Sequence, residues 1–431
     1  MKKMLVLVLV LAMVMTSFAA CSKKEEEAPA PTEAPAATEA PAATEAPADP
    51  TEAPAEPTEA PAEPTEEDSE YRVAMITDYG DITDQSFNQT TYEACKAFCE
   101  AYSVDFTYYK PAGDSTAERV AMVEKAVDEG YNIIVMPGYA FGGTIVETSE
   151  EYPEVKFIAL DVSAGDILEA GVPAKGGEYD YNPGNWNVTD YYYSDNVYCA
   201  VYQEELCGYM AGYAAVKLGY TKLGFLGGMA VPAVMRYGYG FVQGVDAASA
   251  ELGITTSVKH AYGNQFYGDA DITAAMDTWY QAGTEVVFAC GGGIFTSAAE
   301  AAAKVGGKVI GVDVDQAAII DGGYGAGMTV TSAMKGLYPA TYDALDDIIN
   351  KGLWANYAGK IATLGLVSGT DPEANYVQIP MASTQWSGTF TQDDYKAMVA
   401  NMYQGNIKVS NDISAEPATT ATTVEWLGNI K

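Results

Sequence analysis

Acids and glycines directly follow four of the strands that the sequence predicts. These residues are Asp78, Asp161, Gly291-Gly292-Gly293, and Asp313 with Asp315. Individually, acids cap helices and glycines form turns. Parallel sheets bind ligands beyond the carboxyl ends of their strands, so the joint placement favours a binding site. Carboxylates accept hydrogen bonds, and glycine amides at a helix start donate them to a hydroxyl, carboxylate or phosphate.

Other chemistries are disfavoured by composition and motif. The chain has 23 basic and 59 acidic residues and a net charge of −36, so it lacks the cationic surface that nucleic acid requires. His260 is the single histidine, which leaves no pair of imidazoles for a His-rich metal site. The glycine-rich segment is not a phosphate loop of the G-x-x-x-x-G-K-[ST] type, and no G-x-G-x-x-G follows the first predicted strand. We expect no cofactor and no metal.

The chain that must position this site consists of short β-branched runs that alternate with longer segments of helical periodicity. This pattern is typical of βαβ units. A first series of predicted strands covers 71–77, 106–109, 132–136 and 156–160, and a second covers 222–226, 256–260, 285–289 and 308–312. Near-continuous apolar runs indicate strands that are covered on both faces. The predicted fold is α/β, with two doubly wound Rossmann-like lobes and a ligand cleft between them.

Residues 163–195 interrupt this alternation. Gly, Pro, Asn and a tyrosine cluster predict a long inserted loop there, with Trp186 and Tyr191 to Tyr193 as candidates to line the cleft. The insertion is either a lid or a decorated crossover.

The N-terminal region indicates export. Lys2 and Lys3 precede an apolar run that ends in small residues before Cys21, which is the layout of a signal peptide over 1–20. A membrane-spanning anchor is the alternative, but the run is at the short limit for a spanning helix. Phe18-Ala19-Ala20-Cys21 resembles a bacterial lipobox, which implies lipidation of Cys21. Residues 21–69 repeat Pro, Thr, Glu and Ala, so we predict a disordered tether.

Five cysteines follow Cys21, at positions 95, 99, 199, 207 and 290. Cys95 and Cys99 share an apolar helix face with Phe98 and Tyr102, which favours buried, inert thiols. Disulfides are the alternative in an exported protein, but an odd number leaves one thiol free and the pairing cannot be deduced.

Several motifs now occur in a specific order: Asp78-Tyr79-Gly80, Asp84-Gln85-Ser86-Phe87-Asn88-Gln89, Met136-Pro137-Gly138-Tyr139, Gly227-Gly228 with Pro232, Tyr237-Gly238-Tyr239-Gly240-Phe241, Gly311-Val312-Asp313-Val314-Asp315-Gln316, and Thr331-Ser332 with Lys335. The set resembles the basic membrane protein family of ABC-transporter substrate-binding lipoproteins, which includes purine nucleoside receptors. The similarity covers about 70–340. It implies a class I periplasmic-binding-protein-like fold, with lobe 1 over 70–195, lobe 2 over 196–330, and crossovers and C-terminal elements over 331–431.

The resemblance also implies roles for individual residues. Two rings from opposite lobes, Phe87 and Tyr237, would clamp a base, and Asn88 and Asp313 would read its edge. Asp161, the glycine amides from Gly291 and Gly292 onward, and Lys335 would meet the ribose, with Asp78 completing the site. Alternatively, Phe87 and Tyr237 are core aromatics and Lys335 neutralises Asp161.

The function that follows is a lipid-anchored receptor on the outer face of the bacterial cytoplasmic membrane. It would close over a nucleoside, for which the family resemblance implies a purine base, and deliver it to an ABC permease and its ATPase. One alternative is the same fold binding riboflavin, a sugar or a signalling molecule. The other is a nucleoside or glycoside hydrolase that uses Asp313 with Asp315, or Asp161 with Asp313. No base or nucleophile stands out, so we expect no enzyme.

Overall fold

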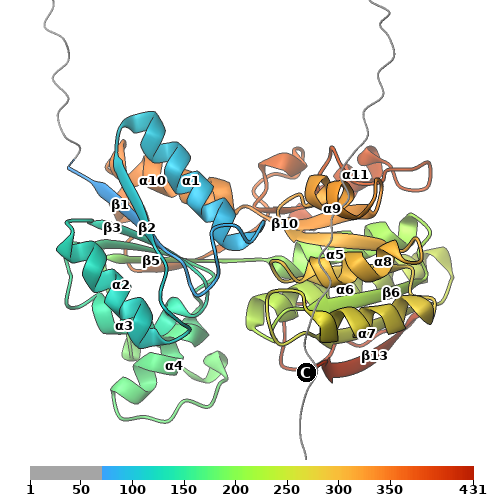
Figure 1. The fold of residues 1–431 in the computed structure, drawn as a ribbon, viewed down its shortest axis with the longest axis horizontal. Helices are drawn as coiled ribbons and strands as arrows, with labels where there is room; N and C mark the ends of the chain where they lie inside the picture. The colour runs from blue at the N-terminus through green and yellow to red at the C-terminus, as the bar shows by residue number, and fades with distance from the viewer. Residues whose placement is uncertain (1–69) are drawn as a thin grey trace, which may run out of the picture. The chain divides into compact units, whose positions relative to one another are not determined.

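The computed structural model describes residues 70–431, and two β-sheets organise this part of the chain (Figure 1). The predicted signal peptide, Cys21 and the tether lie outside the described residues. The prediction of two α/β lobes with parallel sheets is confirmed.

The first sheet has six parallel strands in the order β11-β5-β4-β3-β1-β2. In chain order they are β1 (Arg72–Ile76), β2 (Asp105–Tyr109), β3 (Ile133–Pro137), β4 (Lys156–Leu160), β5 (Val197–Tyr202) and β11 (Lys360–Leu364). The central strands β1, β3 and β4 are almost wholly buried. Their continuous apolar runs reflect helices on both faces.

The second sheet has seven strands in the order β12-β10-β9-β8-β6-β7-β13, and all are parallel except β12, which runs antiparallel to β10. The strands are β6 (Lys222–Gly227), β7 (Thr256–Tyr262), β8 (Val286–Cys290), β9 (Lys308–Asp313), β10 (Thr329–Lys335), β12 (Val377–Gln378) and β13 (Thr422–Asn429).

Helices cover both faces of each sheet. On the first sheet, α1 (Phe87–Tyr102) and α10 (Leu337–Ile349) pack together on one face, and α2 (Thr116–Asp128), α3 (Phe141–Thr148) and α4 (Ala164–Ala174) cover the other. On the second sheet, α5 (Glu204–Lys217), α6 (Pro232–Leu252) and α11 (Gln392–Tyr403) pack on one side, and α7 (Ala270–Gln281), α8 (Phe295–Ala303) and α9 (Ala317–Tyr324) on the other. Short 3-10 turns occur at Pro183–Asn185, Val188–Asp190, Trp354–Asn356 and Pro372–Ala374.

Three connections pass between the lobes. The chain leaves the first sheet after β5, returns after β10 to form α10, and crosses again between β11 and β12. The three connecting segments are hydrogen-bonded to one another, because the Gln203 amide donates to the Leu364 carbonyl and the Gly336 amide donates to the Tyr376 carbonyl. Residues at these crossovers therefore lie where the two lobes meet.

Two differences from the sequence prediction concern the region between residues 163 and 202. The segment from residue 196, assigned to lobe 2, begins with β5, which pairs with β4 in the first sheet. The expected loop over 163–195 begins with helix α4, whose first turn is closed by a capping box between Ser163 and Asp166. Gly165 and Gly171 lower its helix propensity, but the capping box and the burial of Ile167 and Leu168 stabilise it.

Candidate ligand-binding site

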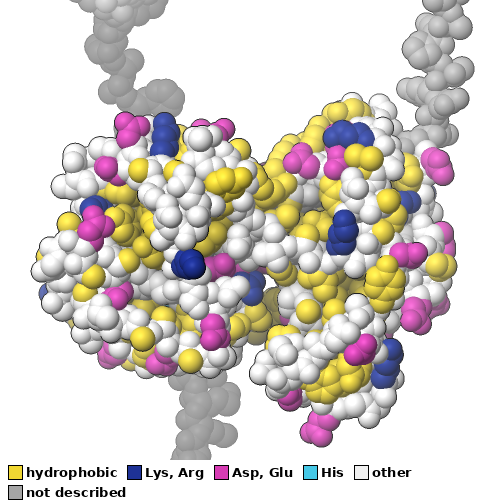
Figure 2. Space-filling model, turned by 180° about the vertical axis from the view of Figure 1, so that it is seen from behind, with side chains coloured by type: hydrophobic (Ala, Val, Ile, Leu, Met, Phe, Trp, Pro, Cys, Tyr) yellow, Lys and Arg dark blue, Asp and Glu magenta, His cyan; other side chains and the backbone are white. Residues whose placement is uncertain are grey.

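A cavity of about 440 Å³ lies between the two lobes at the carboxyl ends of their strands. The space-filling view from behind shows a narrow hollow between the lobes, with charged side chains beside it (Figure 2). All nine residues that the sequence analysis proposed for binding line this cavity: Asp78, Phe87, Asn88, Asp161, Tyr237, Gly291, Gly292, Asp313 and Lys335. Asp315 is not among the lining residues, and its carboxylate accepts a hydrogen bond from Ser383 at 2.7 Å.

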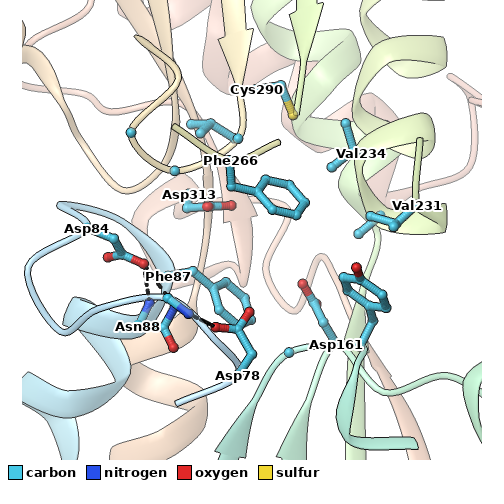
Figure 3. Close-up of a pocket in the computed structure, with 18 of the residues that line it drawn as sticks. Asp78, Asp84, Phe87, Asn88, Asp161, Val231, Val234, Phe266, Cys290 and Asp313 are labelled. Carbon is cyan, nitrogen blue, oxygen red and sulfur yellow. Dashed lines mark hydrogen bonds between the residues drawn. The ribbon is translucent and has the colours of Figure 1, made fainter. Parts of the chain in front are cut away.

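One corner of the cavity is a hydrogen-bonded set of acids and one amide (Figure 3). Asp78 Oδ1 accepts from the amides of Tyr79 and Gly80, each at 2.7 Å, and from Asn88 Nδ2 at 3.2 Å. Asp84 also accepts from Asn88 Nδ2, at 3.1 Å. Both Asn88 donors are therefore used, while its Oδ1 is buried without a partner among the described residues. This oxygen is an acceptor available to a ligand donor.

Burial raises the pKa values of both acids in this corner, although the hydrogen bonds from backbone amides and from Asn88 oppose the shift. Gly80 is needed here, because a Cβ at this position would lie 2.5 Å from Asn88 Nδ2. The Asp-Tyr-Gly turn after β1 thus sets the position of the Asn88 amide.

The Lys335 ammonium occupies the junction of the two lobes. Lys335 is the last residue of β10, and its side chain is 3% exposed. Nζ lies 2.5 Å from Asp161 Oδ2, 3.6 Å from Asp313 Oδ1 and 3.8 Å from Glu204 Oε1. Burial disfavours the charged amine, but the three carboxylates outweigh it and raise the pKa of Lys335.

Aromatic rings surround the same ammonium. Nζ is 4.6 Å from the centroid of the Phe87 ring, 5.5 Å from that of Tyr202 and 5.7 Å from that of Tyr237. Cation–π attraction therefore adds to the ion pairs. The proposed partnership of Lys335 with Asp161 is present, and both residues also line the cavity.

Asp161 and Asp313 share a rare backbone conformation. Each stands at the carboxyl end of its strand with positive φ, 61° and 64° respectively. Left-handed conformations are uncommon for residues other than glycine, and they cluster at functional sites. Here they turn one carboxylate from each lobe toward Lys335.

The rings nearest the middle of the cavity are Phe87 and Phe266, which come from opposite lobes and enter it from opposite sides (Figure 3). Tyr237 has a different environment from the one that the sequence suggested. Its side chain is fully buried, its ring packs edge-on against Phe288, and its hydroxyl donates to Asp313 at 3.3 Å. The added hydroxyl has thus found its partner within the protein.

The sequence analysis did not predict a role for Phe266. Its position shortly after β7, at the carboxyl end of a strand, is the signal that could have identified it. Two glycines make room for its ring: a Cβ on Gly228 would lie 2.4 Å from Phe266 Cδ1, and one on Gly291 would lie 3.0 Å from it. The Gly293 amide donates to the Phe266 carbonyl at 3.0 Å and fixes the loop. The local backbone therefore holds the Phe266 ring in the cavity.

The sequence analysis also did not predict roles for Arg236 and Glu204. Arg236, in the first turns of α6, lines the cavity, and its Nε donates to Glu204 Oε2 at 2.7 Å. Glu204 is fully buried at the start of α5, at the crossover after β5. It lies within 4 Å of two cations that come from different elements, which no local pattern in the sequence reveals.

The cysteines of the described chain are all free and buried, as expected for inert thiols. Burial raises the pKa of each of these thiols well above its usual value. Cys290 lines the cavity. Within residues 70–431, no cluster of three or more His, Cys, Asp or Glu is placed to hold a metal ion, and no helix has both the length and the apolar character needed to cross a bilayer.

Two α/β lobes, joined by three crossovers and with a cavity between them, define the fold class of the described chain. A solved solute-binding protein of an ABC transporter system from Aeropyrum pernix shares it, with a TM-score of 0.57 and 20% identity over 80% of this chain and 88% of that one. Residues 71–370 match the family described as PnrA-like ABC transporter substrate-binding proteins, and the chain belongs to this family. The predicted family resemblance is confirmed.

Two relatives are informative. The ABC transporter nucleoside-binding protein BmpA of Lactococcus lactis is 25% identical over 261 residues, which are 58% of this chain and 65% of that protein. An uncharacterized lipoprotein of Pyrococcus abyssi is 23% identical over 306 residues, 70% of this chain and 68% of that one. The chain thus spans just under two thirds of the length of the Lactococcus protein.

Proposed function

We propose that this protein is the extracytoplasmic, lipid-anchored binding component of an ABC importer and that its ligand is a purine nucleoside. The observation that carries the proposal is the cavity itself, in which Phe87 and Phe266 enter from opposite lobes beside acceptors and donors of hydrogen bonds. A planar base fits between two rings, and a sugar has hydroxyls that suit the carboxylates. The name of the Lactococcus relative, a nucleoside-binding protein, supports this ligand class.

The proposed roles follow from the available atoms. The unpartnered Oδ1 of Asn88 accepts from a base N–H, and Asp313 accepts from another. Asp161, Lys335 and the amides of Gly291 and Gly292 bind the ribose. Asp78 acts indirectly by orienting the Asn88 amide. Phe87 and Phe266 are the clamping rings, while Tyr237 holds the Asp313 carboxylate.

Lipidation of Cys21 and delivery to a permease complete the proposal. The P. abyssi relative is named a lipoprotein, which supports an anchor. Mass spectrometry of the protein extracted from its own membranes tests it, since lipidation at Cys21 removes residues 1–20 and adds acyl chains. Recovery of an unmodified Cys21 in the mature protein would contradict the anchor without affecting the binding proposal.

A thermal-shift screen of residues 70–431 tests the ligand class, because a ligand that binds the folded state raises its melting temperature. The panel contains purine and pyrimidine nucleosides, free bases, riboflavin and sugars. We expect the largest shift with a purine nucleoside. A folded protein, shown to be free of ligand, that responds only to riboflavin or a sugar would replace the purine nucleoside with that class.

The clamp is tested by Phe266→Ala and Phe87→Ala. Each should weaken nucleoside binding by roughly 5- to 100-fold, as expected for loss of one stacking ring. Tyr403→Ala is the matched control, because Tyr403 is a half-exposed aromatic on α11 that does not line the cavity. Gly228→Ala should act like Phe266→Ala, since its methyl group would displace the Phe266 ring. Unchanged affinity in Phe266→Ala would remove this ring from the proposed site.

The site is proposed to bind its ligand without hydrolysing it. Asp161 and Asp313, the carboxylates that a hydrolase would need, are both close to the one ammonium of Lys335. Asp315 bonds to Ser383 and lies outside the cavity lining. Incubation with inosine and analysis for free hypoxanthine tests the point, and release of base at a rate proportional to protein would establish a hydrolase.

A further inference from the structure

Arg236 is the residue of the cavity with the most unused hydrogen-bonding capacity. Its guanidinium has five N–H donors, and within the described chain the partner of this group is Glu204, which accepts from Nε at 2.7 Å. The side chain is 16% exposed, and none of its atoms is buried without a partner. The remaining N–H groups therefore face the space of the cavity that Arg236 lines.

Several carboxylates interact electrostatically with this guanidinium. Burial raises the pKa of Asp166 to about 6, although the hydrogen bonds from Ser163 and the charge of Arg236 oppose the shift. Burial lowers the pKa of Arg236, but the charges of Glu204, Asp161 and Glu205 outweigh this effect and raise it. Asp166 Oδ2 is occupied by the amide and hydroxyl of Ser163, at 2.7 and 2.6 Å, and Asp166 lines the cavity. This end of the cavity thus offers guanidinium donors beside acceptor-only groups.

A hydroxyl group fits such a pair, because it accepts from the guanidinium while it donates to a carboxylate. A phosphate monoester does not. It cannot donate in its doubly charged form, and it would face Asp161, Asp166 and the Glu204 carboxylate that compensates Arg236. An arginine alone would attract phosphate, so Glu204 determines which group is accepted.

The orientation of a nucleoside follows from the proposed function, on which this inference rests. Asp84 and Asn88 lie on one side of the cavity, while Asp161, Val231 and the α6 residue Val234 lie on the other (Figure 3). A base bound at Asn88 places its sugar toward Asp161 and α6, where Arg236 stands one turn from Pro232.

We propose that Arg236, held by Glu204, is a specificity-determining residue that binds the terminal 5′-hydroxyl of the sugar beside Asp166, so that the cavity accepts nucleosides and rejects nucleoside monophosphates. Arg236 contacts the ligand. Glu204 is a positioning residue that holds the guanidinium and cancels its charge.

Calorimetric titration at pH 7.5 with adenosine, 5′-deoxyadenosine and adenosine 5′-monophosphate tests this, or the guanosine series if guanosine gives the larger thermal shift. We expect the wild-type protein to bind the nucleoside roughly 10- to 100-fold more tightly than its 5′-deoxy analogue, as for loss of a hydrogen bond to charged groups. Binding of the monophosphate should be weaker still. A wild-type protein that binds nucleoside and 5′-deoxynucleoside equally would overturn the inference while leaving the proposed function intact.

Two variants assign the preference to its residues. Arg236→Gln should lower nucleoside affinity and reduce the preference for the 5′-hydroxyl to about one- to twofold, because the hydroxyl has lost its donor. Glu204→Gln should narrow the gap between nucleoside and monophosphate by about tenfold, because it leaves Arg236 without its counter-charge. If Arg236→Gln retains the full preference, the inference fails.

The controls are Arg72→Gln and Asp105→Asn. They belong to an Arg–Asp ion pair at the amino end of β1, away from the cavity, and should keep all three affinities. If Arg236→Gln melts below the assay temperature, Arg236→Lys takes its place. It keeps the charge but loses the planar fork, so the preference for the 5′-hydroxyl should fall by at least threefold, and an unchanged preference would overturn the inference. If the wild-type protein binds no nucleoside, the proposed function itself has failed.

Discussion

Asp161 and Asp313 occupy equivalent places in the two lobes, but their surroundings differ. Each follows a buried strand, has positive φ and faces Lys335. Asp313 is held by protein groups, because Ser86 donates to Oδ2 at 2.7 Å and Tyr237 to Oδ1 at 3.3 Å. Asp161 is held by Lys335 through Oδ2, and its Oδ1 is buried without a partner in the described chain.

The difference indicates that the two carboxylates have different structural roles. Ser86 belongs to the first lobe, so its bond to Asp313 joins the lobes directly. The carboxylate of the second lobe therefore links the two lobes, whereas the carboxylate of the first lobe has one oxygen without a partner among the described residues. Burial raises the pKa of Asp161 although Lys335 opposes the shift, which is the expected result for an incompletely satisfied buried acid.

The largest expected effect comes from removing the cation that both acids share. Lys335→Met leaves Asp161, Asp313 and Glu204 close together without the Lys335 ammonium. We expect the free energy of unfolding to fall by about 3–5 kcal/mol, the usual cost of removing one partner from a buried ion pair. Chemical denaturation measures the change.

The matched control for this variant is Lys351→Met. Lys351 also contacts two carboxylates, Asp346 and Asp347, but on the surface. Its loss should change the free energy of unfolding by less than about 1 kcal/mol. Equal effects for the two lysines would show that the buried cluster has no special role in stability.

Much of this fold could be predicted from the sequence. Strands such as β1, β3 and β4 are continuous apolar runs between helical segments, so their positions depend mainly on local pattern. Five strands were not predicted, namely β5, β10, β11, β12 and β13. The edge strands β11 and β13 show the reason most clearly. Each is largely exposed or half-buried, and each pairs with a strand more than 150 residues earlier, a partner that local periodicity does not reveal.

Some residues of the site could likewise be predicted from the sequence and others could not. Asp161 and Asp313 could be found because each stands directly after a strand, and parallel strands align their carboxyl ends. Glu204 could not be found, since its importance depends on Arg236 and Lys335, which lie 32 and 131 positions further along the chain. The stacking role of Tyr237 was inferred from its place in the family motif, whereas the bond from its hydroxyl to Asp313 is defined only by the tertiary structure.

The second prediction tests the acceptor that Asp161 keeps for a ligand. Asp161→Asn removes the charge and gives the side chain two donors, so a sugar hydroxyl loses its strongest acceptor. We expect nucleoside affinity to fall by roughly 10- to 100-fold, measured by calorimetric titration. Unchanged affinity in a folded variant would mean that Asp161 serves only as the counter-charge of Lys335.

The third prediction extends the comparison to Glu205, an acid at the lobe crossover whose Oε2 is buried without a partner in the described chain. Burial raises its pKa from 4.5 to about 7. A raised carboxyl pKa means that the folded protein binds this proton more tightly than the unfolded chain does. The contribution of Glu205 to stability therefore declines as the pH rises from about 4.5 to above 7.

Glu205→Gln removes this dependence. The variant should match the wild type near pH 4 and exceed its free energy of unfolding by about 3 kcal/mol at pH 8, an order-of-magnitude value from the pKa shift. Denaturation curves at several pH values measure it. Parallel pH profiles for the variant and the wild type would mean that Glu205 ionises as it does in the unfolded chain.

The smallest effects should come from the protein groups that hold Asp313. Ser86→Ala and Tyr237→Phe each remove one hydroxyl and leave the carboxylate with its other donor and with Lys335. Each should weaken nucleoside binding by about three- to tenfold, corresponding to about 1 kcal/mol for one hydrogen bond. Ser86→Ala removes a bond between the lobes, which must separate before a nucleoside can leave the cavity, so its loss of affinity should appear mainly as faster dissociation. Tyr237→Phe removes a bond within the second lobe and leaves the contact between Ser86 and Asp313, so it should increase the dissociation rate constant less. Stopped-flow measurement of both rate constants tests this difference, and an equal increase in the dissociation rate constant of both variants would show that the contact between Ser86 and Asp313 does not hold the lobes together.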